Sequence, residues 1–418
     1  MSSHVAPLAS GLIVRNFGGS DVLEIGGVPV TALAAQHGTP LYVFDAALAR
    51  RSLAVLRDAV AGFADIYYSI KANPNPEVAR IFVAEGCGIE IASGNEYRAA
   101  RAAGCQPQNI LFAGPGKGEG ELAYALGEGI GEIHAESFEE IAILGRLARA
   151  LDRTVPISLR INPVAAASGG AMRMGGKPAA FGFDEEILSD ALAALAAHPG
   201  LRFSGVHLFA GTQILDAATL LAQWAHGLEV AARAADLSGQ ALHTIDLGGG
   251  LGIPYHGADG PLDMAAVKAG IGDLMQRKAS HPLLRDARVV LEPGRYLIGE
   301  AGVYLMRVRA VKISRGQRFV ITDGGMHHHL AASGNLGQVI KKDFPIVAAQ
   351  KLGAPAQDVA MLVGPLCTPL DTLGRQTALP ELVAGDLVAV LQSGAYGLSA
   401  SPTGFLSHPL PREIVLNG

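Results

Sequence analysis

The sequence predicts an α/β fold in which a TIM-like (β/α)8 barrel is followed by a separate, mostly β domain. From about residue 40, short apolar runs alternate with segments of helical period, which is the pattern of βα units around a parallel sheet. Eight such units over roughly 230 residues suit a closed barrel better than a Rossmann sheet, which uses fewer strands per domain. Beyond about residue 295, strand-like runs follow one another with few helical stretches between them.

Each predicted barrel strand is a short run of β-branched, aromatic or other apolar residues. In chain order these runs are Ile66–Ser69, Gly88–Ile91, Ile110–Ala113, Glu132–Ala135, Pro156–Ile161, Phe203–Phe209, Thr244–Leu247 and Arg288–Glu292. Helical periodicity fills the intervals, as in Pro76–Glu85, Phe138–Ala150, Asp184–Ala197 and Thr219–Ala235. The order of strand, helix and strand therefore repeats around the whole predicted barrel.

Both ends of the chain are predicted to contain strands outside the barrel. After it come Val303–Ile313, Arg318–Thr322, Val359–Val363 and Asp386–Leu391, separated by glycine and proline. Before it, Leu12–Arg15, Val22–Ile25 and Val28–Val30 read as short strands that can pair with the C-terminal domain. We therefore expect a barrel domain over residues 36–290 and a second domain built from residues 1–35 and 291–418.

The composition excludes several classes of protein. Of 418 residues, 49% are hydrophobic and 17% are charged, which is typical of a folded globular chain rather than a disordered one. A net charge of −5 gives no excess of basic residues for nucleic acid, and no apolar run is long enough to span a membrane. The three cysteines are too few for a disulfide framework, and the N-terminus shows no secretory signal. We expect a cytoplasmic protein.

In such a barrel the catalytic residues lie at the carboxyl ends of the strands, and the sequence predicts a lysine at one of these ends. Lys71 follows the first predicted strand, in Tyr68-Ser69-Ile70-Lys71-Ala72-Asn73. A partly desolvated lysine amine at a barrel mouth can form a Schiff base, although a solvated loop lysine is the commoner case for any single lysine. The neighbouring strand ends must therefore decide between the two interpretations.

Two further strand ends carry the groups that a pyridoxal-phosphate enzyme requires. Gly248, Gly249 and Gly250 follow the seventh strand, the usual place for a phosphate site in a barrel, and match neither a dinucleotide fingerprint nor a P-loop. Glu292 and Arg295 follow the eighth strand. A lysine for an imine, a phosphate cradle and a carboxylate that keeps a pyridine nitrogen protonated together predict pyridoxal 5'-phosphate as the cofactor.

These motifs resemble those of the fold-type III pyridoxal-phosphate decarboxylases, the family of the diaminopimelate and ornithine decarboxylases. The likeness covers nearly the whole chain and includes the lysine motif, the glycine loop, Glu292-Pro293-Gly294-Arg295 and Gly394-Ala395-Tyr396. It implies an alanine-racemase-like barrel with a C-terminal β-sandwich, and decarboxylation of an α-amino acid through a Schiff base and a quinonoid intermediate. It also implies a homodimer whose active sites are shared across the interface.

The resemblance assigns roles to particular residues. Lys71 and Cys367 would be catalytic, with Cys367 entering from the neighbouring subunit to assist protonation of the product. The residues that would contact the cofactor are Lys71, Glu90, Arg160, His207, Phe209, Thr212, Gly248, Gly249, Gly250, Glu292, Pro293, Gly294, Arg295 and Tyr396. Those that would contact the substrate are Arg295, Cys367, Thr368, Asp371 and Tyr396.

The chain also departs from the family pattern. Phe209 stands where the family stacks a histidine on the cofactor ring, and Thr212 replaces a serine. Thr368 stands where ornithine and diaminopimelate enzymes place an acid that faces the distal ammonium, and a lost charge-assisted hydrogen bond costs about 1.5–3 kcal/mol. In diaminopimelate decarboxylases an Arg and a Tyr that hold the distal carboxylate follow shortly after the segment aligned with His327–His329, and this chain has neither. We expect no metal at the three histidines, because adjacent residues on a strand point to opposite faces.

With the Gly-rich segment around Gly175-Gly176, these departures resemble the subgroup of exosortase-A-associated and carrier-protein-linked glutamyl decarboxylases. The resemblance favours an amino acid without a distal ammonium, free or tethered to an acyl carrier protein. A docked carrier would require a basic patch, expected to include Arg173 and Lys177. The alternatives are a diaminopimelate-type decarboxylase, an amino-acid racemase, and a regulatory homologue that binds the cofactor without catalysis.

Overall fold

The structure is a computed structural model that describes residues 7–19, 21–164, 172–173, 178–209, 211–256, 259–336 and 341–418. It forms two compact units. The barrel unit comprises Ser52–Ile253 and Pro261–Tyr296, and the sheet unit comprises Met1–Arg51, Pro254–Gly260 and Leu297–Gly418. Within the described ranges, none of the helices has the length and apolar character that a membrane span requires.

The strands of the barrel unit close into a parallel ring, as the sequence predicts. In ring order they are β4 (Asp65–Ser69), β5 (Gly88–Ile91), β6 (Ile110–Phe112), β7 (Glu132–Ala135), β8 (Val155–Asn162), β11 (Leu201–Leu208), β13 (Thr244–Asp246) and β14 (Arg288–Leu291). β14 pairs in parallel with β4, and β7 pairs with β8, so no edge remains open. All eight predicted strands are confirmed, and with them the TIM-like barrel.

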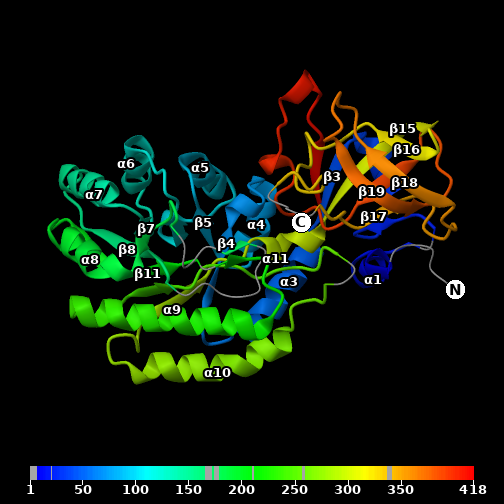
Figure 1. Ribbon diagram of the computed structural model, residues 1–418. Helices are drawn as coiled ribbons and strands as arrows, with labels where there is room; N and C mark the ends of the chain where they lie inside the picture. The colour runs from blue at the N-terminus through cyan, green and yellow to red at the C-terminus, as the bar shows by residue number, and fades with distance from the viewer. Residues whose placement is uncertain are drawn as a thin grey trace. The chain divides into compact units, whose positions relative to one another are not determined.

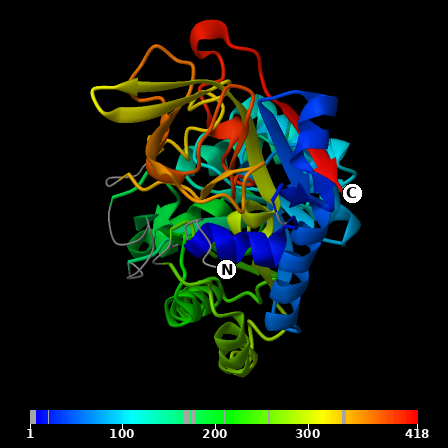
Figure 2. The same cartoon turned by 90° about the vertical axis from the view of Figure 1, so that its right-hand side faces the viewer.

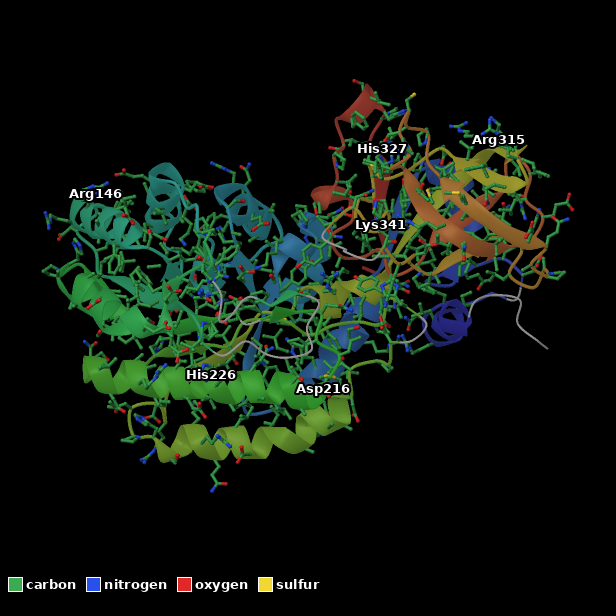
Figure 3. The ribbon with its side chains drawn as sticks, viewed as in Figure 1. Arg146, Asp216, His226, Arg315, His327 and Lys341 are labelled. Atoms are coloured by element: carbon green, nitrogen blue, oxygen red, sulfur yellow. The ribbon has the colours of Figure 1, made fainter. Side chains whose placement is uncertain are left out.

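Helices cover the outside of this ring (Figure 1). They are α4 (Pro76–Ala84), α5 (Gly94–Ala102), α6 (Glu119–Gly127), α7 (Phe138–Ala150), α8 (Leu188–Ala196), α9 (Ala217–Ser238) and α10 (Met264–Ser280). Side-chain oxygens of polar residues accept the free N–H groups at several helix starts, which defines where those helices begin. The capping residues are Asn75, Ser93, Ser137, Asp216 (Figure 3) and Asp263. Apolar side chains such as Phe82, Leu144 and Trp224 are buried in the barrel unit.

The sheet unit contains the strands that the sequence predicts after the barrel (Figure 2). Its strands are β3 (Leu41–Asp45), β15 (Gly302–Ser314), β16 (Gln317–Thr322), β17 (Ile346–Ala348), β18 (Asp358–Val363), β19 (Thr372–Leu379), β20 (Leu387–Val390) and β21 (Arg412–Leu416). They pair in the order β17, β20, β15, β16, β18, β19, and β3 joins β15 to β21. The strands expected after residue 295 are thus present, and the barrel with a separate sheet unit has the architecture of the predicted fold class.

One predicted strand at the N-terminus is wrong. Leu12–Arg15 lies inside helix α1 (Pro7–Asn16), which places the fixed φ of a proline at its first position, where a helix accepts it. Leu12 is buried with Leu23 and Leu305 in the apolar core of the sheet unit. The other two runs form the short pair β1 (Glu24–Ile25) and β2 (Val28–Pro29), and Val30 starts helix α2 (Val30–His37).

Candidate active site

Lys71 lies where the sequence places it, in the short 3-10 turn Ile70–Ala72 directly after β4. Its Nζ atom donates to both carboxylate oxygens of Glu90, at 3.0 and 2.9 Å. Glu90 is at the end of the next strand, β5, is 1% exposed, and also accepts a hydrogen bond of 2.6 Å from Ser69 Oγ. A buried carboxylate thus holds the half-exposed Lys71 amine at the mouth of the barrel.

The glycine run after β13 is built of positions that tolerate no side chain. Gly248 has φ +67°, and a Cβ atom there would lie 2.4 Å from the carbonyl oxygen of Leu208. A Cβ on Gly249 would lie 2.4 Å from the carbonyl oxygen of Glu292, and Gly250 has φ +100°. The backbone of this loop therefore packs directly against the ends of β11 and β14. A loop of bare backbone is the kind of structure whose N–H groups bind phosphate.

Phe209 and Thr212 flank this loop on the β11 side. The Phe209 Cδ2 atom is 3.2 Å from the position of a Cβ on Gly248, so the ring lies against the glycine run. Thr212 belongs to the two-residue strand β12 (Gly211–Thr212), which pairs with β9 (Met172–Arg173). The structure thus brings Phe209 beside the loop, while the contacts of Phe209 and Thr212 with the cofactor ring and phosphate stay predictions.

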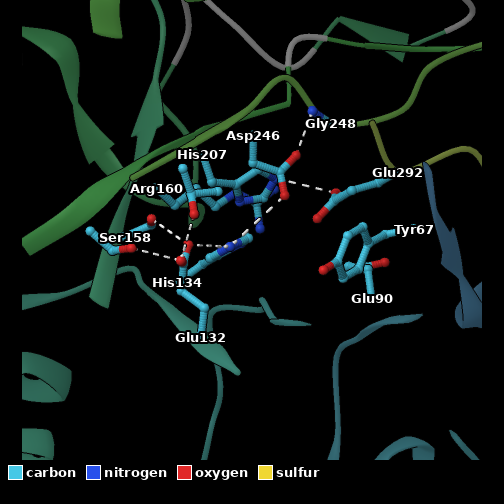
Figure 4. A network of polar contacts seen from close by, with 12 residues as sticks. Tyr67, Glu90, Glu132, His134, Ser158, Arg160, His207, Asp246, Gly248 and Glu292 are labelled. Carbon is cyan, nitrogen blue, oxygen red and sulfur yellow. Dashed lines mark hydrogen bonds and ion pairs between the residues drawn. The ribbon is translucent and has the colours of Figure 1, made fainter. Parts of the chain in front are cut away.

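Glu292 follows β14 and is 5% exposed. Its Oε2 atom lies 3.3 Å from Nε2 of His207, which points from β11, and its N–H donates to the Gly248 carbonyl at 2.8 Å (Figure 4). Burial alone would raise the pKa of Glu292, but His207 and the Lys71 amine hold that pKa below its ordinary value. Burial lowers the pKa of His207 to about 4. At neutral pH the pair is therefore an ionised carboxylate beside a neutral imidazole.

The segment Pro293–Arg295 packs against the turn that carries Lys71. The N–H of Ser69 donates to the Pro293 carbonyl at 3.2 Å, and a Cβ on Gly294 would lie 2.9 Å from Cβ of Ala72. Arg295 begins the short helix α11 (Arg295–Ile298). The motif after the eighth strand and the lysine motif after the first are therefore neighbours in the closed ring.

Arg160 is engaged by an acid of the barrel itself. Arg160 lies on β8. Its Nη1 atom donates to Glu136 Oε1 at 2.7 Å, and its guanidinium lies 5.0 Å from the centre of the Phe181 ring. Burial would raise the pKa of Glu136, but Arg160 and Lys117 lower it. The structure shows a buried ion pair at this position, and the expected contact of Arg160 with the cofactor stays a prediction.

Two residues of the barrel interior received no role from the sequence. Asp246, the last residue of β13, and His134 of β7 are fully buried, with Asp246 Oδ2 3.9 Å from His134 Nε2 (Figure 4). The His134 and His207 rings lie 4.5 Å apart. A signal was present: Glu132 and His134 alternate along a predicted strand, which places two polar side chains on one face where apolar ones are expected.

Glu132 lies beneath these groups and is fixed by hydroxyls from three strands. It accepts hydrogen bonds from Ser158, Ser204 and Thr244, at 2.5, 2.7 and 2.8 Å. Burial opposes ionisation, but His134 and the hydroxyl donors lower the pKa of Glu132 to about 2. Glu132 is therefore a buried carboxylate that stays charged at neutral pH.

The remaining predicted site residues belong to the sheet unit. Cys367 is exposed and Tyr396 is partly exposed, whereas Cys87 and Cys105 are buried, each with its pKa raised by burial to about 11. Asp371 is 2% exposed, and its oxygens accept the N–H groups of Met326 and Leu366 at 2.6 and 2.9 Å. Asp371 thus anchors the loop of Cys367, while its contact with substrate stays a prediction.

The three consecutive histidines lie in a turn and not on a strand, contrary to the premise of the expectation made for them. His327 (Figure 3), His328 and His329 are all buried. Nδ1 of His329 accepts the N–H of Ala332 at 3.2 Å, and its Nε2 atom lies 3.0 Å from Ser393 Oγ. These two contacts hold His329 in the neutral form with its proton on Nε2.

The barrel groups fit a phosphorylated pyridine aldehyde. Lys71 offers an amine, the glycine run offers a backbone cradle that any Cβ would fill, and Glu292 offers an ionised carboxylate. Among the described residues, Glu292 Oε1 is buried without a hydrogen-bond donor, so it can accept one from a protonated ring nitrogen. Around one barrel mouth, these groups can bond an amine to a carbonyl carbon, anchor a phosphate and keep a pyridine ring protonated as an electron sink.

Comparison with known proteins agrees with this chemistry. Residues 48–299 match the family described as "Pyridoxal-dependent decarboxylase, pyridoxal binding domain". The chain is 38% identical over 396 residues, 94% of its length and 92% of the relative's, to the L-glutamyl-[BtrI acyl-carrier protein] decarboxylase of Niallia circulans. It is 34% identical over 401 residues, 95% of its length and 92% of the relative's, to the diaminopimelate decarboxylase of Zymomonas mobilis.

Solved structures give the same result. The diaminopimelate decarboxylase of Helicobacter pylori, crystallised with L-lysine, superposes with a TM-score of 0.82 and 28% identity, over 93% of this chain and 94% of that one. A protein of Aquifex aeolicus, AQ1208, superposes with a TM-score of 0.83 and 28% identity, over 98% of this chain and 94% of that one. The likeness thus extends over both units.

Proposed function

The chain belongs to the pyridoxal-dependent decarboxylases, and we propose that its substrate is an α-amino acid without a distal ammonium, carried as a thioester on an acyl carrier protein. Family membership makes the chain a carboxy-lyase that uses pyridoxal phosphate. The observation that carries the finer proposal is the 38% identity to a decarboxylase named for a carrier-bound glutamyl substrate. The loop that follows β18 supports it independently.

That loop presents no free carboxylate to a distal ammonium. In residues 364–371 the one acidic residue is Asp371, and both of its oxygens accept backbone N–H groups. Thr368, next to Cys367, is neutral, and its Oγ1 atom lies 3.3 Å from the N–H of Leu370. A substrate ammonium that met this loop would lose its hydration without a charged partner, which is unfavourable. A neutral thioester end loses little by comparison.

The barrel residues act on the cofactor and the substrate at one place. Bound pyridoxal phosphate supplies the electron sink for the electron pair that remains on Cα when carbon dioxide leaves. We assign Lys71 Nζ to hold the cofactor's carbonyl carbon, with Glu90 orienting the amine. Glu292 holds the proton on the pyridine nitrogen, and the Gly248–Gly250 backbone binds the phosphate. Phe209 covers the ring face from the β11 side.

The protonation step involves the sheet unit. We assign the exposed thiol of Cys367 to deliver a proton to Cα, from the second subunit of a homodimer. Of the basic pair expected to dock the carrier, Lys177 and the Arg173 side chain lie outside the described residues.

Carbon dioxide release from paired substrates tests the proposal. The purified holoenzyme is given glutamate as a carrier-protein thioester, free glutamate, free lysine and free diaminopimelate. We expect the thioester to have a kcat/KM at least about tenfold above every free amino acid, because the carrier adds binding energy that a free acid lacks. Equal or faster release from a free diamino acid would contradict the proposal.

One second candidate function is favoured by a specific observation. Diaminopimelate decarboxylases match 94% or more of this chain in several organisms, so diaminopimelate itself is the alternative substrate. Its distal carbon bears both an ammonium and a carboxylate. The same experiment separates the two, since diaminopimelate is one of its four substrates.

A further inference from the structure

Two carboxyl groups meet in the barrel interior without a donor between them. Asp246 is 0% exposed and Glu292 is 5% exposed, and a carboxylate oxygen of each lies within 4.8 Å of one of the other (Figure 4). Asp246 Oδ1 accepts the N–H of Gly248 at 2.8 Å. Among the residues that the structure describes, Asp246 Oδ2 and Glu292 Oε1 have no hydrogen-bond donor. Two acceptors that face each other therefore lack the proton that would join them.

Two ionised carboxylates cannot stay in this arrangement. Like charges in contact repel most strongly where water is excluded, and such pairs commonly share one proton. A single proton turns one of the two acids into an O–H donor that joins the pair, and the lone pairs that remain on Glu292 can still accept a hydrogen bond from a protonated ring nitrogen. The geometry thus requires one neutral acid, and the surroundings decide which of the two it is.

The groups around Glu292 favour its ionised form. His207 Nε2, from β11, lies 3.3 Å from its Oε2 atom, and the Lys71 amine at the end of β4 lowers its pKa. Burial, and to a smaller extent His134 and Arg160 on β8, lower the pKa of His207 to about 4, so His207 is a neutral imidazole at neutral pH. Glu292 therefore has the His207 imidazole and the positive charge of the Lys71 amine on its side of the pair.

The groups around Asp246 favour its neutral form. Burial, the Glu292 charge and the more distant charge of Glu132 on β7 all raise the pKa of Asp246 well above its ordinary value, and the hydrogen bond from the Gly248 N–H opposes them. His134 stands between the acids, with Nε2 3.5 Å from Glu132 Oε1 and 3.9 Å from Asp246 Oδ2. His134 is thus closer to the charged Glu132 than to Asp246.

We infer that Asp246 is a neutral carboxylic acid at neutral pH that donates its proton in a hydrogen bond to Glu292, and that it is a positioning residue for the group that contacts the cofactor's pyridine nitrogen. The link to the cofactor rests on the proposed role of Glu292. The protonation of Asp246 does not, because it follows from the two side chains alone. A carboxylate that accepts this hydrogen bond is less basic, so it leaves the pyridine proton in place.

Infrared spectroscopy of the cofactor-free protein at pH 7 tests the inference. An unionised carboxyl gives a carbonyl stretching band that a carboxylate lacks, and the band shifts in heavy water. We expect this band in the wild type, and we expect it to shift when aspartate side chains are labelled with carbon-13 but not when glutamate side chains are. The labelling arm uses the unaltered chain, so it does not depend on a variant that folds.

Two substitutions locate the proton. Asp246→Asn removes the acid and retains a neutral donor of similar shape, so the band should disappear. Glu292→Gln supplies an amide donor to Asp246, which then has no need of its proton, so the band should also be lost. Asp45→Asn is the matched control, because Asp45 is buried as well but already accepts hydrogen bonds from Ala47 N–H and Asn417 Nδ2, at 2.9 and 3.1 Å. This control should keep the band.

Three outcomes would overturn the inference: no band in the wild type, a band that shifts with labelled glutamate, or a band that persists in Asp246→Asn. A divalent metal bound stoichiometrically to the wild type and lost in Asp246→Asn would overturn it too, since a cation would keep Asp246 ionised. All of these measurements are made without substrate. A failure of the carbon dioxide assay therefore leaves them unaffected, and the two proposals can fail separately.

Discussion

At the scale of single residues, charge complementarity at Thr368 carries the substrate proposal. A neutral side chain beside Cys367, and an Asp371 whose oxygens are held by backbone N–H groups, leave the loop without a partner for an ammonium. The same residues would let the chain share the fold and cofactor of diaminopimelate decarboxylases and still act on the different substrate that we propose. Substrate class would then depend on one position more than on the barrel.

Thr368→Asp should therefore change the preference. It restores a carboxylate for a distal ammonium, and one charge-assisted hydrogen bond of about 1.5–3 kcal/mol corresponds to a gain of about tenfold or more in kcat/KM for free lysine or diaminopimelate. Steady-state carbon dioxide release measures this gain in kcat/KM. Leu370→Asp is the control, because it adds the same charge at a position of the same loop that is 52% exposed. A gain of equal size in Leu370→Asp would show that general loop charge, and not position 368, matters.

His329 should make the sheet unit sensitive to acid. Burial lowers its pKa to about 3, against about 6.5 in the unfolded chain, so at low pH the unfolded state binds the extra proton. The contribution of His329 to stability is complete above about pH 6.5 and is lost as the pH falls toward 3, by up to about 1.4 kcal/mol for each pH unit.

Urea unfolding between pH 7 and pH 4 measures this effect in His329→Gln. The variant should be less stable at pH 7 but should show a shallower loss of unfolding free energy with acid. His37→Gln, at the partly exposed C-terminal end of α2, should keep the wild-type slope. A His329→Gln slope equal to that of the wild type would show that the buried imidazole is not the acid-sensitive group.

At the scale of elements, the glycine loop after β13 should be the least tolerant part of the barrel mouth. Gly248→Ala places a Cβ 2.4 Å from the Leu208 carbonyl oxygen at φ +67°, so the loop must move. We expect the affinity for pyridoxal phosphate to fall at least about tenfold, as a displaced backbone loses phosphate hydrogen bonds of about 1.5 kcal/mol or more. Titration of the cofactor-free protein with pyridoxal phosphate, followed by absorbance, measures this affinity.

Gly239 provides the control for backbone strain alone. It ends α9 at φ +65°, nearly the same φ as that of Gly248, but a Cβ there meets nothing within 4 Å. Gly239→Ala should cost about 1 kcal/mol of stability without changing cofactor affinity. Equal losses of affinity in the two variants would mean that the glycine loop does not bind the cofactor.

The elements differ in how well the sequence predicts them. The barrel strands were predictable because each is a short apolar run between a helix and a turn, and the ring then places Lys71, Glu90 and Glu292 at adjacent strand ends. Helix α1 was not, because Ile13 and Val14 suggest a strand, whereas the proline at the start and the buried Leu12 and Asn16, one helical turn apart, suit a helix. Local β propensity gave way to packing in the sheet unit.

The interior polar groups were the least predictable part of the site. Asp246 precedes the glycine run and His134 lies on a predicted strand, but a sequence does not show that β7 and β13 point both side chains at one place. That convergence follows from closure of the ring and its register. A motif search finds residues that are near in the sequence, and this network joins residues that are far apart in it.

At the scale of the whole molecule, the proposed homodimer makes each active site a product of two chains. Lys71→Ala and Cys367→Ala each remove one proposed catalytic group, from different units of the chain. If the site combines Lys71 of one subunit with Cys367 of the other, mixed dimers contain one intact site. Random exchange should then restore up to about a quarter of the wild-type activity.

The check is to mix the two inactive variants, allow the subunits to exchange, and measure carbon dioxide release against each variant alone. Activity that stays at the level of the single variants, while exchange is shown by mass, would place Lys71 and Cys367 in the same chain's site or remove Cys367 from the mechanism. Sedimentation of the wild type establishes the dimer itself.

The most direct test of the account is to locate the lysine that holds the cofactor. The holoenzyme is reduced with borohydride, digested and analysed by mass spectrometry, and its visible absorbance is followed through the reduction. We predict that the absorbance band disappears, that the added mass is found on the peptide containing Lys71, and that Lys71→Ala shows neither. Cofactor fixed to another lysine, or an unchanged band in Lys71→Ala, would contradict the assignment of this barrel mouth as the active site.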